Sequence, residues 1–305
     1  MTTEPVRVLE KPASQPVTLD RPTRRDAPAP PDATTSTRGI LRTGPQPLPF
    51  TLDRFAPGAA VASRVERYWS TRWDLPAGRE HVQEILPHPS VNLVAYGGIV
   101  RIHGIPSRRD ARRLVGRGAA VGTKFRPGAF AAFCRVPMPA LRGAVLTTSE
   151  AFGPDGAALE AELLAIVGDG DPDETAVVRA IAAVERFLTD RMPADDPMFD
   201  LIQEIVRDML RRAPEVRVAT IARDHGVSER TLQRVFRERV GVGPKWVLRR
   251  YRLHTAAERI GAEGADDLAG LAHELGYADQ AHFSNDFRQA VGLQPRAYAV
   301  ACGHH

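Results

Sequence analysis

A segment near the C-terminal end of this chain occurs twice, and the spacing of the copies limits the folds this region can adopt. The matched pairs are Ala222 with Ala272, Gly226 with Gly276, Phe236 with Phe287, Gly241 with Gly292, and Pro244 with Pro295. The offset is 50 residues up to the glycine and 51 after it, so the second copy has one more residue in the turn. A register that is kept on both sides of one insertion predicts two copies of a single structural unit.

Each copy has the pattern of a helix, a tight turn and a second helix. We name residues 218–243 the first unit and residues 268–294 the second unit. Gly226 and Gly276 can adopt a positive φ and end the first helix of each unit. Ser228 and Asp279 follow these turns and are expected to cap the second helices.

The second helix of the first unit is expected to have one apolar face and one polar face. Leu232, Val235 and Phe236 share the apolar face, which can pack on the preceding helix. The opposite stripe holds three arginines and a glutamine: Arg230, Gln233, Arg234 and Arg237. A solvated surface is the usual explanation of such a stripe. Here the repeat, the glycine turn and the cap all favour a helix that enters the major groove, where Arg pairs with guanine and Gln with adenine.

A long helix from Pro244 to about Gly261 is expected between the units, because proline is favoured in a first helical turn. Its first nine residues carry Lys245, Arg249, Arg250 and Arg252. Residues 216–262 have a net charge of about +7, from 11 Lys or Arg and 4 Asp or Glu, whereas residues 263–305 have about −4. Because phosphate neutralisation supplies most non-specific affinity, we expect the first unit and this helix to dominate DNA binding.

The fold class predicted for the whole chain is α+β. Residues 1–47 are rich in Pro, Thr and Arg and are expected to be a disordered tail, or an arm that contacts DNA. Residues 48–165 contain short apolar runs between turns and predict a β-rich domain, with helical pieces at 61–68 and near 130–134. Residues 166–213 are expected to form a helical connector with helices at 173–191 and 197–212, and residues 214–300 the double helix-turn-helix domain.

No pattern indicates a cofactor, a metal site or an enzyme. The histidines and the two cysteines have no metal-ligand spacing, and no apolar run is long enough to span a membrane. Four residues of the N-terminal half could line an effector pocket: Trp69, Trp73, Phe125 and Arg126. A core role is an alternative for the two tryptophans and Phe125, and Arg126 could instead lie in a turn packed against the β domain. Two rival functions remain at this point, an alkyl-transfer repair protein that uses Cys134 and an adaptor that binds only proteins.

At these residues the C-terminal region resembles the AraC/XylS family of transcription regulators. The matching stretches are 226–236, 241–244, 252–253 with Ala256, 275–283, 287–288, and 292–295 with Tyr298. The resemblance implies two helix-turn-helix units joined by a long helix. It also implies DNA contacts by Arg230, Gln233 and Arg234 in the first unit, and in the second unit by Gln280, His282, Ser284 and Asn285. This sequence departs from the family at Gly243 and Gln294, where Ser is common, and at Asn285, where a basic residue is usual.

The N-terminal half resembles the sensor-type domain of some actinobacterial members of that family, at 65–69, 86–93 and 122–129. That resemblance implies a cupin-like β fold with a role in ligand binding or dimerisation. The expected partners are double-stranded DNA, RNA polymerase, a small-molecule effector and a second copy of the chain. The expected location is the cytoplasm, at the nucleoid.

Overall fold

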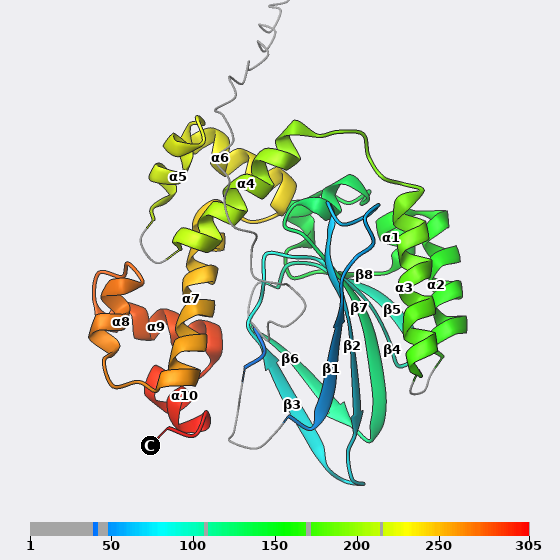
Figure 1. The fold of residues 1–305 in the computed structure, drawn as a ribbon, viewed down its shortest axis with the longest axis horizontal. Coiled ribbons are helices and arrows are strands. Elements are labelled where there is room, and N and C mark those ends of the chain that lie inside the picture. Colours follow the sequence, from blue (N-terminus) through cyan, green and yellow to red (C-terminus); the bar gives the residue numbers. More distant parts are fainter. Residues whose placement is uncertain (1–38, 42–47, 107–108, 169–171, 214–215, 305) are drawn as a thin grey trace, which may run out of the picture. The chain divides into compact units, whose positions relative to one another are not determined.

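The computed structural model describes residues 39–41, 48–106, 109–168, 172–213 and 216–304. An antiparallel six-stranded sheet, in the order β1-β2-β7-β4-β5-β8, forms the centre of the N-terminal domain, and β3 pairs with β6 in a separate two-stranded sheet (Figure 1). The strands are β1 Phe50–Phe55, β2 Val65–Asp74, β3 Glu80–Ile85, β4 Asn92–Tyr96, β5 Ile99–His103, β6 Asp110–Val115, β7 Arg117–Phe125 and β8 Val145–Leu146. The predicted β-rich domain is confirmed.

One face of the six-stranded sheet is apolar and is covered by helices α2 (Pro154–Val167) and α3 (Glu174–Thr189) (Figure 1). Alternate residues of β2, β4 and β7 point to that face, and the helices add leucine and valine side chains to the same core. On the opposite face, Trp69 and Trp73 of β2 lie across from Gly122 and Gly118 of β7.

The glycines of β7 make room for the tryptophan rings. A Cβ atom added at Gly122 would lie 2.1 Å from Cε2 of Trp69, and one at Gly118 would lie 2.5 Å from Cζ2 of Trp73. The two indoles therefore lie directly on the neighbouring strand, and a larger residue at Gly118 or Gly122 would displace them.

Two short 3-10 helices and α1 close the N-terminal domain, and α4 leads from it toward the repeated units. The 3-10 helices are η1 Ala129–Ala132 and η2 Met138–Leu141, and the α-helices are α1 Thr148–Phe152 and α4 Pro197–Arg212. Asp173 caps α3 through the amide of Ala176 at 2.7 Å, and Asp196 caps α4. The predicted helices at 173–191 and 197–212 are thus confirmed.

The C-terminal domain is entirely helical. Figure 1 shows α7 running between α5 and α6 at one of its ends and α8 and α9 at the other. The helices are α5 Val218–Asp224, α6 Glu229–Val235, the π-helix η3 Phe236–Val240, α7 Pro244–Glu263, α8 Leu268–Glu274, α9 Gln280–Val291 and α10 Pro295–Ala301. The repeated sequence therefore forms two units on one connecting helix, as predicted.

Three expectations for the N-terminal half need correction. Residues 61–68 do not form a helix, because from Val65 onward they pair with β7 as part of β2. The β-rich region also ends in two helices, α1 and α2, which were not predicted. Within the predicted tail, Ile40 pairs with Ile85 and Leu41 is buried, so these residues belong to the fold. Residues 1–38 and 42–47 lie outside the described part.

Candidate nucleic-acid interface

The first unit has the geometry that its sequence predicts. Gly226 lies between α5 and α6 with a φ of 66°, and the Ser228 hydroxyl accepts a hydrogen bond from the Thr231 amide at 3.1 Å. Leu232 is buried on the inner face of α6. The outward side chains of α6 are therefore held on a helix whose start and inner face are both fixed.

The stripe on the outer face of α6 and η3 is exposed. Its four members are the residues singled out in the sequence: Arg230, Gln233, Arg234 and Arg237. Arg234 donates to Glu238, one turn later, at 2.9 Å, and both side chains are more than half exposed. An exposed pair of this kind is weak, so the guanidinium can leave it for a base or a phosphate.

The second unit repeats the geometry with different chemistry. Gly276 has a φ of 70°, and the Asp279 carboxylate accepts from the His282 amide at 2.7 Å. Gln280, His282 and Asn285 are exposed on α9, while Ser284 is half-buried. The structure thus brings the predicted residues of this unit to one helix, and none of them carries a permanent positive charge.

Only part of the positive charge of α7 faces solvent. Lys245 is exposed in the first turn, but Arg250 is buried, and burial lowers its pKa to about 10. Arg252 donates to the carbonyl oxygens of Ala213 at 2.7 Å and Val216 at 2.8 Å. Arg252 thus joins α7 to the segment that follows α4, and Arg250 is enclosed in the interior, so the charge count of the sequence overstates the positive charge that α7 exposes.

The structure adds a contact between α4 and the first unit that the sequence did not indicate. Asp208 of α4 is buried, and its carboxylate lies 2.9 Å from Arg212 and 3.4 Å from Nε2 of His225, which ends α5. Arg212 also reaches Asp224 at 2.9 Å. The connector therefore holds the end of α5 through the buried carboxylate of Asp208. The sequence does not indicate this contact, because an acidic residue in an amphipathic helix is usually exposed.

The four residues proposed for an effector pocket are not gathered around one cavity. Phe125 is fully buried in the core with Phe130, their ring centroids 4.9 Å apart. Trp69 and Trp73 lie on the other face of the sheet, over the glycines of β7. Arg126 donates to the Ala62 carbonyl at 2.9 Å. Phe125 thus has the core role that was its alternative.

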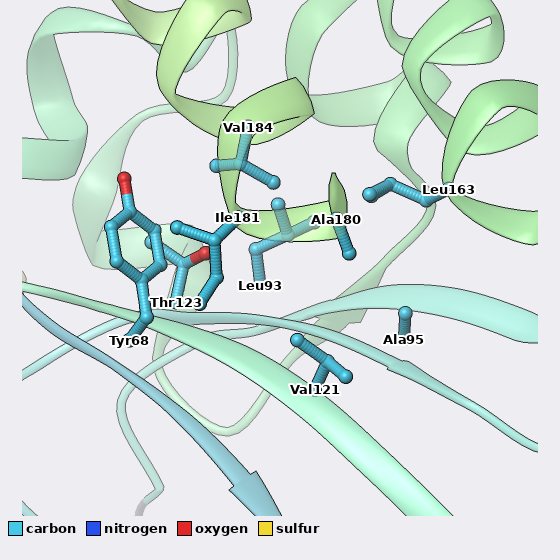
Figure 2. Close-up of a pocket in the computed structure, with 9 residues that line it drawn as sticks. All are labelled: Tyr68, Leu93, Ala95, Val121, Thr123, Leu163, Ala180, Ile181 and Val184. Carbon is cyan, nitrogen blue, oxygen red and sulfur yellow. The ribbon is translucent and has the colours of Figure 1, made fainter. Parts of the chain in front are cut away.

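A cavity between the sheet and the helices is lined by apolar residues (Figure 2). Its lining residues are Tyr68, Leu93, Ala95, Val121, Thr123, Leu163, Ala180, Ile181 and Val184. The volume is about 10 Å³, which is close to the space that one water molecule needs. In this structure the cavity is a packing defect of the core and is too small for an effector.

The sheet face that carries Trp69 also holds a buried ionic cluster. A β-bulge at Val65–Arg67 places Glu66 beside Lys124, 2.8 Å from its Nζ atom, and Arg67 lies 3.5 Å away. Burial and the charges of neighbouring arginines lower the pKa of Lys124 to about 8, against the opposing effect of Glu66. Burial raises the pKa of Glu66, but the charges of Lys124 and Arg67 outweigh it and hold that pKa below its usual value.

An alkyl-transfer repair protein would need a reactive thiolate, and the surroundings of Cys134 disfavour one. The thiol is half-buried, and burial raises its pKa, which disfavours the reactive thiolate. The described residues contain no group of three or more His, Cys, Asp or Glu placed to hold a metal ion. Across the same residues no helix has the length and apolar content needed to cross a membrane.

Comparison with known proteins agrees with this double unit. Residues 205–300 match the family model described as a helix-turn-helix domain, and residues 53–147 match a domain of unknown function, DUF6597. A Streptomyces lividans protein named as an AraC-like transcription regulator is 37% identical over 81 residues, which are 27% of this chain and 26% of that protein. The transcriptional activator RhaS of Pectobacterium carotovorum is 32% identical over 83 residues, 27% of this chain and 29% of its own length.

Two solved structures are also similar. An AraC-type regulator from Chromobacterium violaceum is 24% identical, with a TM-score of 0.32, and the match covers 34% of this chain and 93% of that one. ToxT from Vibrio cholerae is 11% identical with a TM-score of 0.36, over 84% of this chain and 98% of that one.

The family models and the curated relatives concern two parts of the chain. Its C-terminal region is a double helix-turn-helix domain. More specifically, that region is similar to AraC-like transcription regulators, and residues 53–147 match the DUF6597 model. The match spans about a quarter of the length of the Streptomyces relative.

Proposed function

We propose that this chain is a transcription regulator that binds specific sites in double-stranded DNA with both units, at the nucleoid in the cytoplasm. The observation that carries the proposal is the exposed stripe of Arg230, Gln233, Arg234 and Arg237 on a capped helix that is packed only on its inner face. Guanidinium and amide groups at this spacing suit the acceptor and donor edges of bases in the major groove.

The proposed DNA contacts differ between the two units. In the first unit, Arg230, Gln233 and Arg234 would contact bases, and Arg237 and Lys245 would neutralise phosphates. In the second unit the contacts would be made by neutral or weakly basic side chains: Gln280, His282, Ser284 and Asn285. This division is supported by the charges of the exposed residues, because cations supply the salt-dependent part of binding.

The test is selection from random-sequence duplex DNA by the full chain, followed by sequencing of what is retained. We expect enrichment of a site with two conserved blocks one helical turn apart, at a spacing of roughly 34 Å. An Arg230→Ala, Arg234→Ala double variant is the control, and we expect it to enrich nothing. Equal enrichment by the control, or no enrichment by the parent chain, would refute DNA recognition by this stripe.

We further propose that a small molecule bound by the N-terminal domain controls this binding. The support is the buried ionic cluster of Glu66, Arg67 and Lys124 on the sheet face that carries the half-exposed Trp69. Tryptophan fluorescence of the full chain during titration with a panel of metabolites tests this, with Trp69→Phe as control. Absence of any change in both fluorescence and DNA affinity would contradict it.

A further inference from the structure

The second recognition helix, α9, carries a buried carboxylate on the face that docks onto α7. Asp286 is only 7% exposed. Its Oδ1 atom accepts a hydrogen bond from the guanidinium of Arg249 in α7. The same guanidinium reaches Gln289, one turn further along α9, at 3.5 Å. The contact therefore joins the connecting helix to two successive turns of α9.

Other groups around the carboxylate are polar as well. Nε2 of His282 lies 4.0 Å from Asp286, and the ring of Tyr277 packs edge-on against His282 with centroids 5.2 Å apart. Burial, together with the nearby Asp286 carboxylate, raises the pKa of Tyr277. Asp286 also acts on the buried Arg250, where it partly offsets the lowering of that guanidinium's pKa.

The first unit has no such carboxylate. The offset of 51 residues that relates Phe236 to Phe287 places Val235 at the position of Asp286. Val235 is buried among the apolar residues of its unit. One recognition helix is thus docked by an apolar side chain, and the other is docked by an ion pair with the helix that joins them.

We propose that Asp286 and Arg249 form an ionic strut between α7 and α9, and that Arg249 is a positioning residue for the second recognition helix rather than a phosphate contact. A buried charge that loses its partner is costly, so the pair holds the helix at one angle to α7. Site recognition by the second unit then depends on Arg249, although the side chain itself stays on the protein. This inference rests on the proposed DNA binding.

The experiment uses a duplex selected by the full chain and a second form of that duplex. In the second form, the block of bases that the second unit recognises is scrambled. Affinity is measured by fluorescence anisotropy between about 50 and 200 mM salt. We expect Arg249→Ala and Asp286→Asn each to weaken binding to the intact duplex by about tenfold, as the loss of a recognised base position would. Binding to the scrambled duplex should stay the same, and the salt slope should not change.

A phosphate contact gives the opposite pattern. Arg249→Ala would then weaken both duplexes equally and lower the salt slope by about one, and Asp286→Asn would tighten binding by releasing a cation. Either result overturns the proposal. Arg288→Ala is the matched control, because it removes an exposed cation from α9 without touching the strut.

A paired variant separates positioning from a general loss of folding. Arg249→Met combined with Asp286→Val replaces the ion pair by apolar side chains like those of the first unit, and such replacements are often tolerated. We expect the pair to recover most of the affinity that Arg249→Ala loses. If it is as weak as Arg249→Ala while α9 stays protected from hydrogen exchange, the strut does not act through docking.

Hydrogen exchange without DNA provides the last arm. In Arg249→Ala the amides of α9 should exchange faster than in the parent chain, and those of α6 should exchange at the same rate. Equal protection of α9 in Arg249→Ala and in the parent chain would overturn the strut. This arm decides the strut even if no duplex is enriched, a result that would refute only the proposed function.

Discussion

The outward positions of the two recognition helices can be compared residue by residue. Arg230, Arg234 and Arg237 of the first unit correspond to Ala281, Asn285 and Arg288 of the second. All six are exposed, so the difference concerns the surface offered to DNA and not the packing. The backbone geometry of a helix-turn-helix unit is thus compatible with very different charge, and the two units are expected to contribute differently to binding.

The two units also differ in what they pack against. Buried residues of the first unit, such as Phe236, belong to one hydrophobic cluster with the sheet and with α2 to α4. Buried residues of the second unit, such as Phe287, belong to a separate cluster, which Leu41 and Leu86 complete. The unit with the basic stripe is therefore continuous with the core of the N-terminal domain.

The largest expected effect concerns these two clusters. Phe236→Ala and Phe287→Ala should each reduce the free energy of unfolding by about 3–5 kcal/mol, because both rings are fully buried. Calorimetry and circular dichroism should show that Phe236→Ala lowers the melting temperature of the sheet as well. Phe287→Ala should instead produce a separate unfolding transition of the second unit at a lower temperature. Identical melting profiles for the two variants would show that the clusters unfold as one.

The next effect tests the charge asymmetry. Arg234→Ala should weaken binding to the selected duplex by roughly 1–3 kcal/mol, since a guanidinium on a base edge is lost. His282→Ala should cost less, because the imidazole carries no permanent charge and also packs on Tyr277. Anisotropy titrations at two salt concentrations measure both. If His282→Ala costs as much as Arg234→Ala, the second unit contributes as strongly as the first.

The helix caps allow a matched comparison of stability. Removing the side chains that cap α6 and α9, in Ser228→Ala and Asp279→Ala, should each destabilise the protein by about 1 kcal/mol. Asp279→Ala should cost a few tenths more, because its carboxylate also interacts with the positive end of the helix dipole. Urea denaturation measures both, with Thr189→Ala at an exposed site as control. A neutral Asp279→Ala would contradict the role of the observed hydrogen bond to His282.

The smallest expected effect is on the salt dependence of DNA binding, at one pair of equivalent cations in the two units. Lys245 follows Pro244, and at the equivalent position Arg296 follows Pro295; both are exposed. If both units lie on DNA, Lys245→Ala and Arg296→Ala should each lower the salt slope by about 0.9 and weaken binding only a few-fold. If only Lys245→Ala lowers the salt slope, the second unit does not contact the phosphates through Arg296.

The sequence predicted the repeated units well because their signals are local. A glycine that must adopt a positive φ, a capping side chain three residues before a helical amide, and an apolar face at helical spacing all act within one turn of chain. The strand β2 was missed at 61–68 because a β-bulge at Val65–Arg67 interrupts the alternation of side chains that indicates a strand. The choice between a pocket and the core stayed open for Phe125, because alternation does not tell which face of a sheet is covered.

Local sequence signals specify the two helix-turn-helix units, the capping of helices at Ser228 and Asp279, and the side chains of α6 that face outward. Tertiary contacts set the surroundings of the cations of α7: Arg249 pairs with Asp286, Arg252 donates to backbone carbonyls, and Arg250 is buried in the interior. A guanidinium has the same charge wherever it lies, and its partner is set by residues up to 39 positions away. Only the packing of α4, α7 and α9 brings those partners within hydrogen-bonding distance.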